Sequence, residues 1–368
     1  MTRHIDTATL REWLDQGRPV TVLDIRSDDD RQQWSIPGSI HLNAYEALRQ
    51  GEPGLLRDAL VPQDRPVVTV CNAGRMSEKA ADFLTDRSID VYSLAGGMKA
   101  WSMAWNTADV PLTETTTRVI QIRRTGKGCL SYFVVSGDEA AVIDPSVGTD
   151  VYESLARHNG CRIRWVLETH IHADHLSRAR RLAEQSGASL LLPAQERARF
   201  PFAAVADGHQ IKIGAATLTA LRTPGHTEES TSYLADGAAV FSGDTLFING
   251  VGRPDLHART DGARARAQML FQSLNRLRAL PPEVLVLPAH TAEPVPFDGV
   301  AIQARIGDAE QWLSQWLRSE EFFIERVTSR IPATPPNFST IVGLNEAGRE
   351  PEGDPTELEA GANRCAIS

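Results

Sequence analysis

Three histidines and an aspartate lie within six positions near the middle of the chain, directly after an apolar run. The run reads WVLETHIHADH at 165–175, and its polar members are His170, His172, Asp174 and His175. Imidazole nitrogens and carboxylate oxygens suit zinc or iron, whereas thiolate metal sites need paired cysteines. The four cysteines of this chain are far apart in sequence. The spacing therefore predicts a metal site built from nitrogen and oxygen donors.

Further candidate ligands follow three other apolar runs with strand character. PGHT stands at 224–227 after the run 216–221, FSGDTLF at 241–247 continues the run 238–241, and LPAH at 287–290 ends the run 284–287. These motifs add His226, Asp244 and His290, each at the point where a predicted strand gives way to a loop. We therefore expect all these side chains to meet at one edge of the fold.

This set of motifs resembles the metallo-β-lactamase superfamily, which implies an αββα sandwich. Two relatives within it fit the motifs. Resemblance to glyoxalase II-like thioesterases implies two Zn²⁺ per chain, with His170, His172 and His226 on one, Asp174, His175 and His290 on the other, and Asp244 bridging. Resemblance to persulfide dioxygenases implies one Fe²⁺ per chain, held by His170, His226 and Asp244. The other four side chains would then orient ligands and handle protons. Both ligand sets are present, so the motifs alone do not separate the two.

The elements that must position these residues can be read from apolar periodicity. In the metal-binding region, strands are predicted at 117–123, 130–135 and 140–144, and helices at about 150–159, 177–186 and 302–318. In the first 105 residues, strands are predicted at 19–25, 67–70 and 91–94, with a helix at 77–86. Strands that alternate with helices favour a small α/β domain with parallel strands.

The informative residue of that first domain is Cys71, which directly follows a predicted strand and opens the loop CNAGRMS at 71–77. A tight loop at a helix N-terminus directs backbone N–H groups and the positive end of the helix dipole to one point. A thiolate or a terminal persulfide anion would be stabilised there. Cys129, Cys161 and Cys365 have no such context, and we interpret them as structural or incidental.

Four matches in order make residues 1–105 similar to the rhodanese domain: LDIR at 23–26, IPGSIHL at 36–42, the Cys71 loop, and LAGGMKAW at 94–101. The resemblance implies that Cys71 carries sulfane sulfur. The loop that would hold this sulfur comprises Asn72, Ala73, Gly74, Arg75, Met76 and Ser77. Many members of the family have arginine five residues after the cysteine, whereas here Arg75 is four residues after it and Met76 takes the usual place.

The fusion of the two domains favours persulfide chemistry over thioester hydrolysis, because a sulfur carrier has no evident use beside a lactoyl thioesterase. The loop GVGRPDL at 250–256 is also similar to a Gly-Arg loop of persulfide dioxygenases. Arg253 is a candidate for binding a substrate carboxylate, with an ion pair to Asp255 as the structural alternative. The expected activity is oxidation of a low-molecular-weight persulfide by dioxygen to sulfite, with Cys71 exchanging sulfur with sulfite or thiosulfate. The alternative is a dinuclear zinc thioesterase with a regulatory or sulfur-carrier rhodanese domain.

Length and composition complete the expected organisation. At 368 residues two domains are the default, and we expect a rhodanese-like domain at 1–105, a linker at 106–117, the metallo-β-lactamase-fold domain at 118–330 and a C-terminal arm at 331–368. The formal net charge of −9, with scattered basic residues, argues against nucleic acid or an anionic membrane as partner. Without a signal peptide or an apolar run of about 18 residues, a cytoplasmic location is expected, and a homo-oligomer remains open.

Overall fold

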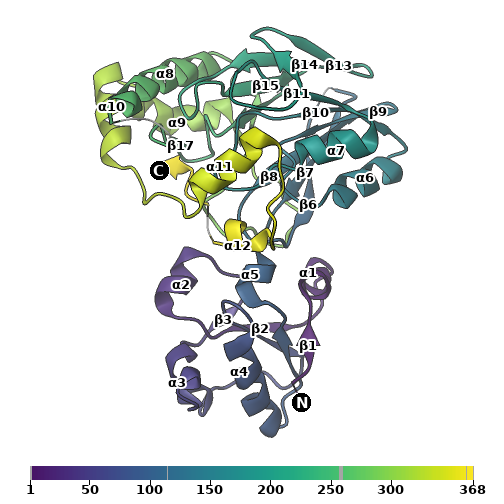
Figure 1. Cartoon of the computed structure of the whole chain (residues 1–368), viewed down its shortest axis with the longest axis vertical. Helices are drawn as coiled ribbons and strands as arrows, with labels where there is room; N and C mark the ends of the chain where they lie inside the picture. Colours follow the sequence, from purple (N-terminus) through teal and green to yellow (C-terminus); the bar gives the residue numbers. More distant parts are fainter. Residues whose placement is uncertain (1, 114, 257–259, 362, 368) are drawn as a thin grey trace.

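The computed structural model describes residues 2–113, 115–256, 260–361 and 363–367, and of residues 260 and 261 only the backbone. Figure 1 shows two bodies joined end to end, with the first hundred residues forming the smaller one. The C-terminal segment runs back across the larger body and reaches the contact between the two. None of the helices in the described ranges combines the length and apolar character that crossing a membrane requires.

The small domain contains a five-stranded sheet in the order β1-β5-β4-β2-β3, and its strand pairs are all parallel, as predicted. Its strands are β1 (His4–Ile5), β2 (Thr21–Asp24), β3 (Ile40–His41), β4 (Val67–Val70) and β5 (Val91–Leu94). Its helices are α1 (Thr7–Asp15), α2 (Asp28–Gln33), α3 (Tyr45–Arg49), α4 (Arg75–Asp86) and α5 (Gly97–Trp101), with a 3₁₀ turn at Gly54–Leu56. β4 is buried on both faces, as expected of a strand covered by crossover helices.

The large domain is a four-layer αββα sandwich, as the motifs led us to expect. One sheet has the order β12-β11-β10-β9-β8-β7-β6 and the other β13-β14-β15-β16-β18-β19. The first sheet comprises β6 (Asn106–Val110), β7 (Arg118–Arg123), β8 (Leu130–Ser136), β9 (Glu139–Ile143), β10 (Arg162–Leu167), β11 (Ser189–Pro193) and β12 (Ala203–Val205). The second comprises β13 (Gln210–Ile213), β14 (Ala216–Arg222), β15 (Thr231–Ala235), β16 (Ala239–Gly243), β18 (Leu285–Pro288) and β19 (Ala304–Arg305).

Helices cover the outer face of each sheet of the sandwich. They are α6 (Thr149–His158) and α7 (Ala179–Ser186) on the first sheet, and α8 (Thr260–Arg278), α9 (Ile306–Trp316) and α10 (Glu320–Ser329) on the second. Every residue of β8 is buried because Tyr132 faces the core between the sheets and Phe133 faces the helices. Burial on both faces explains why such strands read as continuous apolar runs instead of alternating ones.

The segment expected as a linker, 106–117, is partly a strand. β6 pairs antiparallel with β7, with Asn106 opposite Arg123 and Val110 opposite Val119, and so forms the edge of the first sheet. A short polar segment with one proline looks like a linker, but alternate burial of Ala108 and Val110 against the sandwich makes it part of the second domain.

The C-terminal arm, 331–368, is ordered over its described residues. It contains α11 (Phe338–Ala347), α12 (Thr356–Glu359) and β20 (Ala366–Ile367). β20 pairs with β17 (Val251–Gly252), while α12 packs beside α5 of the small domain, as Figure 1 shows in yellow and blue. The arm therefore contacts both domains and ends beside the loop that follows Asp244.

Candidate metal centre

Three buried donor atoms meet where β10, β14 and β16 end. The Nε2 atom of His170 lies 3.7 Å from Oδ2 of Asp244, and the Nε2 atom of His226 lies 3.5 Å from the same oxygen. Two donors bound about 2.1 Å from one ion lie roughly 3 to 3.5 Å apart, so the spacing is close to that of a shared ion. These residues form a group whose ligand atoms all lie within 4.8 Å of one another.

The hydrogen bonds behind the two imidazoles leave both Nε2 atoms free as acceptors. The Thr169 hydroxyl donates to Asp144 Oδ2 at 2.8 Å, so it accepts from Nδ1–H of His170, 2.9 Å away. Nδ1–H of His226 donates to the carbonyl oxygen of Arg253 at 2.8 Å. Nε2 of His170 and Oδ2 of Asp244 have no hydrogen-bond partner although both are buried. Unpaired buried polar atoms are costly, and a bound cation would satisfy them.

The electrostatic surroundings favour the protonation states that metal ligands need. Burial lowers the pKa of His170 well below its usual value, with neighbouring imidazoles adding to the effect, and burial also lowers the pKa of His226. Burial alone would raise the pKa of Asp244, but His290 and His226 lower it below the ordinary value. Two neutral imidazoles and an ionised carboxylate result.

His172 lies beside His170, with ring centroids 4.1 Å apart, but its Nε2 atom points elsewhere. That atom is 2.9 Å from Oε2 of Glu168 and 3.2 Å from Oδ1 of Asp144. Burial acts to lower the pKa of His172, but the two carboxylates outweigh it and raise the pKa well above the usual value. By distance His172 does not belong to the group of His170, His226 and Asp244, although its Nδ1 atom is buried and has no hydrogen-bond partner.

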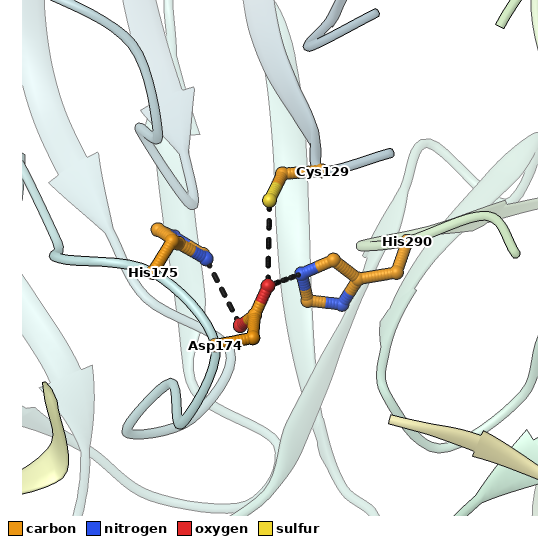
Figure 2. A group of neighbouring side chains, drawn as sticks. All are labelled: Cys129, Asp174, His175 and His290. Carbon is orange, nitrogen blue, oxygen red and sulfur yellow. Dashed lines mark hydrogen bonds and ion pairs between the residues drawn. The ribbon is translucent and has the colours of Figure 1, made fainter. Parts of the chain in front are cut away.

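A second buried group adjoins the first and contains Asp174, His175 and His290. Nδ1 of His290 is 2.5 Å from Oδ1 of Asp244, and its Nε2 atom is 2.8 Å from Oδ2 of Asp174. Nδ1 of His175 is 3.1 Å from Oδ1 of Asp174. Figure 2 shows that a fourth side chain, Cys129, points into the same group, with Sγ 3.3 Å from Oδ2 of Asp174. Burial and Asp174 act to raise the pKa of this thiol, but His175 and His290 bring it down to about 7.

The arm places two more side chains at the centre. The Asn363 amide donates to Oδ2 of Asp174 at 2.9 Å, and Cys365 belongs to a buried group with Asp244 and His290. Burial, together with nearby carboxylates, raises the pKa of the Cys365 thiol well above its usual value. Cys129 and Cys365, which we expected to be structural or incidental, therefore line the metal centre. Cys161 lies apart, with its thiol 3.7 Å from the Ala156 carbonyl.

Arg253 forms the ion pair with Asp255 that we considered as the structural alternative to substrate binding. Its side chain is fully buried and makes a bidentate pair with Asp255, with both N–O distances 2.8 Å. Its remaining donor bonds to the carbonyls of Ala333 and Arg364 in the arm. The neighbouring Gly252 approaches closely, because a Cβ atom there would lie 2.9 Å from Cβ of His226. The loop thus holds the arm and the candidate ligand His226 in place. The Arg253 guanidinium is bonded to Asp255 and to the arm, and not to a substrate carboxylate.

Cys71 lies between β4 and α4, as predicted. Its Sγ atom accepts from the backbone N–H of Gly74 at 3.2 Å and lies 3.4 Å from the hydroxyl of Ser77. Gly97 closes the cradle from below, because a Cβ atom there would meet the Cys71 carbonyl oxygen at 2.3 Å. Gly74 has a φ of 91°, a conformation that suits glycine, and helix α4 begins at the next residue.

The other members of the loop have separate partners. The Asn72 amide donates to Asp30, the Met76 side chain packs on the domain core, and Ala73 and Arg75 are exposed. Arg75 is exposed, whereas the Cys71 thiol is buried. The cradle is therefore built mainly from backbone N–H groups and the Ser77 hydroxyl.

Sequence reasoning missed several residues that shape the centre: Cys129, Asp144, Glu168, Asn345, Asn363 and Cys365. Asp144 carried a signal, because it ends a predicted strand as the ligands do. Cys129 carried none, because its place depends on a backbone bridge between Cys129 and His290, far apart in sequence.

Comparison with known proteins agrees with this geometry. The rhodanese-like domain model matches residues 6–104, and the metallo-beta-lactamase superfamily model matches residues 124–290. Among curated proteins, hydroxyacylglutathione hydrolase from Acidiphilium cryptum is 36% identical over 191 residues, which cover 49% of this chain and 75% of the relative. The hydroxyacylglutathione hydrolase from Anaeromyxobacter dehalogenans is 34% identical over 197 residues, covering 51% of this chain and 74% of the relative.

Solved structures show the same fold. ETHE1 from Myxococcus xanthus superposes with a TM-score of 0.55 at 28% identity, covering 62% of this chain and 98% of that protein. A metallo-beta-lactamase from Staphylococcus aureus superposes with a TM-score of 0.58 at 26% identity, covering 64% of this chain and 74% of that protein. The chain belongs to the metallo-beta-lactamase superfamily, as a homologue of hydroxyacylglutathione hydrolase that carries an N-terminal rhodanese-like domain.

Proposed function

We propose that this protein oxidises a low-molecular-weight persulfide, such as glutathione persulfide, to sulfite at one Fe²⁺ held by His170, His226 and Asp244. The reaction balances as R–S–SH + O₂ + H₂O → R–SH + SO₃²⁻ + 2 H⁺. The outer sulfur supplies four electrons to dioxygen, and the inner sulfur leaves as a thiol. The single observation that carries the proposal is the different fate of the neighbouring histidines His170 and His172.

Two histidines and one carboxylate are the ligand set that non-haem ferrous oxygenases use, and they leave coordination positions open for substrate and dioxygen. When bound, Fe²⁺ would supply the redox chemistry with dioxygen that side chains cannot. A third histidine ligand would instead make a zinc site of the kind found in hydrolases. In this chain the third candidate, His172, is paired with Glu168 and Asp144 and is absent from the donor group.

The surrounding residues would hold the ligands in place. Thr169 fixes the ring of His170, the Arg253 carbonyl fixes His226, and His290 bonds to Oδ1 of Asp244 while Oδ2 faces the two imidazoles. Such contacts orient ligands and raise their basicity.

The rhodanese-like domain supports the same chemistry. A persulfide on Cys71 would end in an anionic sulfur, and the N–H groups at the start of α4 stabilise negative charge there. We propose that Cys71 exchanges sulfane sulfur with sulfite or thiosulfate. Sulfite from the metal centre would then be a substrate for the other domain.

A dinuclear zinc thioesterase is the second candidate, favoured by the hydroxyacylglutathione hydrolase relatives and by the second group of Asp174, His175 and His290. The similarity to ETHE1 and to these hydrolases supports the two readings side by side. For the hydrolase, His172 would have to offer its Nδ1 atom, which is buried and has no hydrogen-bond partner, while its Nε2 atom stays beside Glu168 and Asp144. A pair of zinc ions would then generate a hydroxide nucleophile.

The decisive experiment measures oxygen uptake and sulfite formation by ferrous-loaded protein given glutathione persulfide. We expect one O₂ consumed per sulfite, and loss of both iron and activity in His170→Ala. The matched variant His172→Gln should keep iron, because His172 donates to carboxylates and not to the ion. Brisk hydrolysis of a glutathione thioester without oxygen uptake, together with metal loss in both variants, would transfer the assignment to the thioesterase.

A further inference from the structure

A cavity of about 560 Å³ lies between α7, β11 and α11 of the arm. Figure 1 shows α11 running beside α7, on the helix-covered side of the first sheet. The volume falls in the range of roughly 300 to 1,000 Å³ that is usual for small-molecule sites. His170 and His172 border the cavity, but its lining includes neither His226 nor Asp244. The cavity therefore lies beside the metal-binding loop and not over the donor group.

Much of the cavity wall is apolar. Leu190 and Leu192 line it from β11, Leu344 lines it from α11, and Phe200 adds an aromatic ring. Leu192 is buried, whereas the other three are only half-buried. Apolar surface that remains open to water inside a concave site is unfavourable, and an apolar ligand would cover it.

Three arginines also line the cavity, and one of them has no acidic partner. Arg180 pairs with Glu184 at 2.8 Å, and Arg181 pairs with Glu350 at 2.8 Å. Arg349 is exposed and makes no side-chain hydrogen bond or ion pair with the residues that the structure describes. One positive charge is therefore left uncompensated at the mouth of the cavity, where an anionic group of a ligand could lie.

The polar side chains at the end of the cavity nearest the metal-binding loop are already bonded to one another and to the loop. The Ser177 hydroxyl donates to Glu168, whose other oxygen lies 2.9 Å from Nε2 of His172. The Asn345 amide donates to the carbonyls of His172 and His175, both at 2.9 Å, and its oxygen accepts from the Ser177 N–H at 2.9 Å. These groups need no polar partner from a ligand, so the inner part of the ligand can be apolar.

The arm is held over the cavity by contacts on two sides. The Gly348 carbonyl accepts from the Arg180 guanidinium at 3.1 Å, and the Arg199 N–H donates to the Glu346 carbonyl at 2.7 Å. Gly348 has a φ of 60°, and a Cβ atom there would lie 2.5 Å from the Phe200 ring, so glycine allows this close approach. A cavity whose walls are fixed in this way loses little conformational freedom when a ligand binds.

We propose that this cavity binds an amphiphilic carboxylate, a ligand with an apolar body and one anionic group, such as a medium-chain fatty acid. The apolar body would cover Leu190, Leu192 and Leu344. The carboxylate would lie against Arg349, whose planar guanidinium can donate to both carboxylate oxygens. The ligand would touch α7 and the arm together, and this binding does not depend on the reaction proposed at the metal centre.

Titration calorimetry and hydrogen exchange of the full-length protein test the proposal. Sodium decanoate should bind with a stoichiometry of one per chain. Octanoate, which is shorter by two methylene groups, should bind about tenfold more weakly. Decyltrimethylammonium, which carries a cation on the same chain, should bind more weakly still. Decanoate should slow amide hydrogen exchange in peptides that cover α7 and α11, which locates the site without any substitution.

Two pairs of variants separate the charge from the cavity. Arg349→Gln should weaken decanoate binding by about tenfold, whereas Arg330→Gln, at an exposed arginine that does not line the cavity, should bind as wild type does. Leu344→Trp should fill the cavity and abolish binding, whereas Leu60→Trp, on the surface of the small domain, should not. Absence of decanoate binding by wild type, equal binding by Leu344→Trp, or protection confined to other segments would overturn the proposal.

Discussion

At the scale of single residues, the candidate ligands share a place directly after a strand, but the hydrogen-bond partners of each side chain determine what it can do. His170 and His172 are two positions apart, yet one presents a free Nε2 atom toward Asp244 and the other is paired with Glu168 and Asp144. The same holds for thiols. The Cys71 thiol accepts from the Gly74 N–H at the start of α4, whereas the Cys161 thiol donates to a carbonyl oxygen and packs against apolar side chains.

This contrast leads to a prediction for sulfur transfer. Cys71→Ser should reduce transfer from thiosulfate to cyanide by on the order of 10³-fold or more, because a hydroxyl cannot carry sulfane sulfur. Iron content should not change, since Cys71 lies in the other domain. The control is Cys161→Ser, which should keep wild-type transfer. Substantial transfer by Cys71→Ser would show that the sulfur carrier is a different residue.

The sequence predicted that His170, His226 and Asp244 would lie together, because each follows a strand and buried strands can be recognised as apolar runs. It could not predict the orientation of His172, which depends on carboxylates contributed by the ends of two strands. It also missed Cys129. No motif surrounds this cysteine, and its neighbour His290 follows a strand of the other sheet, far away in the sequence. The sequence allowed two roles for Arg253, and it could not show that the carbonyls of Ala333 and Arg364 in the distant arm also bond to this side chain.

At the scale of elements, the arm behaves as part of the metal domain. The Asn345 amide of α11 donates to the carbonyls of His172 and His175, both at 2.9 Å, and so holds the metal-binding loop. Glu359, at the end of α12, accepts from Arg124 at 3.0 Å, Arg178 at 2.9 Å and the N–H of Leu176 at 2.8 Å. A proline-rich, acidic composition suggested an arm, but the buried carboxylate that anchors it could not be told from its exposed neighbours.

Glu359 should make stability depend on pH. Burial would raise its pKa, but Arg124 and Arg178 hold it at about 2, below the value of about 4.3 in an unfolded chain. Because the folded-state pKa is the lower one, this carboxylate stabilises the fold fully above about pH 5, and the contribution fades as pH falls toward 2. Glu359→Gln should therefore cost about 3 kcal/mol in the free energy of unfolding near neutral pH.

Urea unfolding of wild type and Glu359→Gln, followed at about pH 7 and about pH 4, measures this effect. The difference in free energy between the two proteins should narrow at the lower pH. Glu357→Gln, on the same helix, removes an exposed partner of Lys99 and should change stability by no more than about 0.5 kcal/mol. A difference that stays constant across this range would contradict the lowered pKa of Glu359.

At the scale of the whole molecule, the turn between β7 and β8 contacts the small domain, the C-terminal arm and the metal centre. Trp34 of the small domain donates from its indole nitrogen to the Thr125 carbonyl at 3.0 Å, and Lys127 donates to the Glu359 carbonyl of the arm at 2.8 Å. The same turn ends at Cys129 in the metal centre. The division of the chain into two folds could be predicted from its motifs, but this docking could not, because it depends on backbone atoms that any residue provides.

Gly126 is the position at which that docking is most exposed to substitution. Its backbone does not need glycine's conformational freedom, but a Cβ atom there would lie 1.8 Å from the Trp101 carbonyl oxygen in the small domain. Gly126→Ala should therefore push the domains apart, which costs about 1 to 3 kcal/mol of interface stability.

We expect a larger radius of gyration in small-angle scattering of Gly126→Ala and an earlier melting transition for its small domain. Gly353→Ala, where an added Cβ atom meets nothing within 4 Å, should match wild type in both measurements. An unchanged radius of gyration and melting profile in Gly126→Ala would show that this turn does not fix the arrangement of the domains.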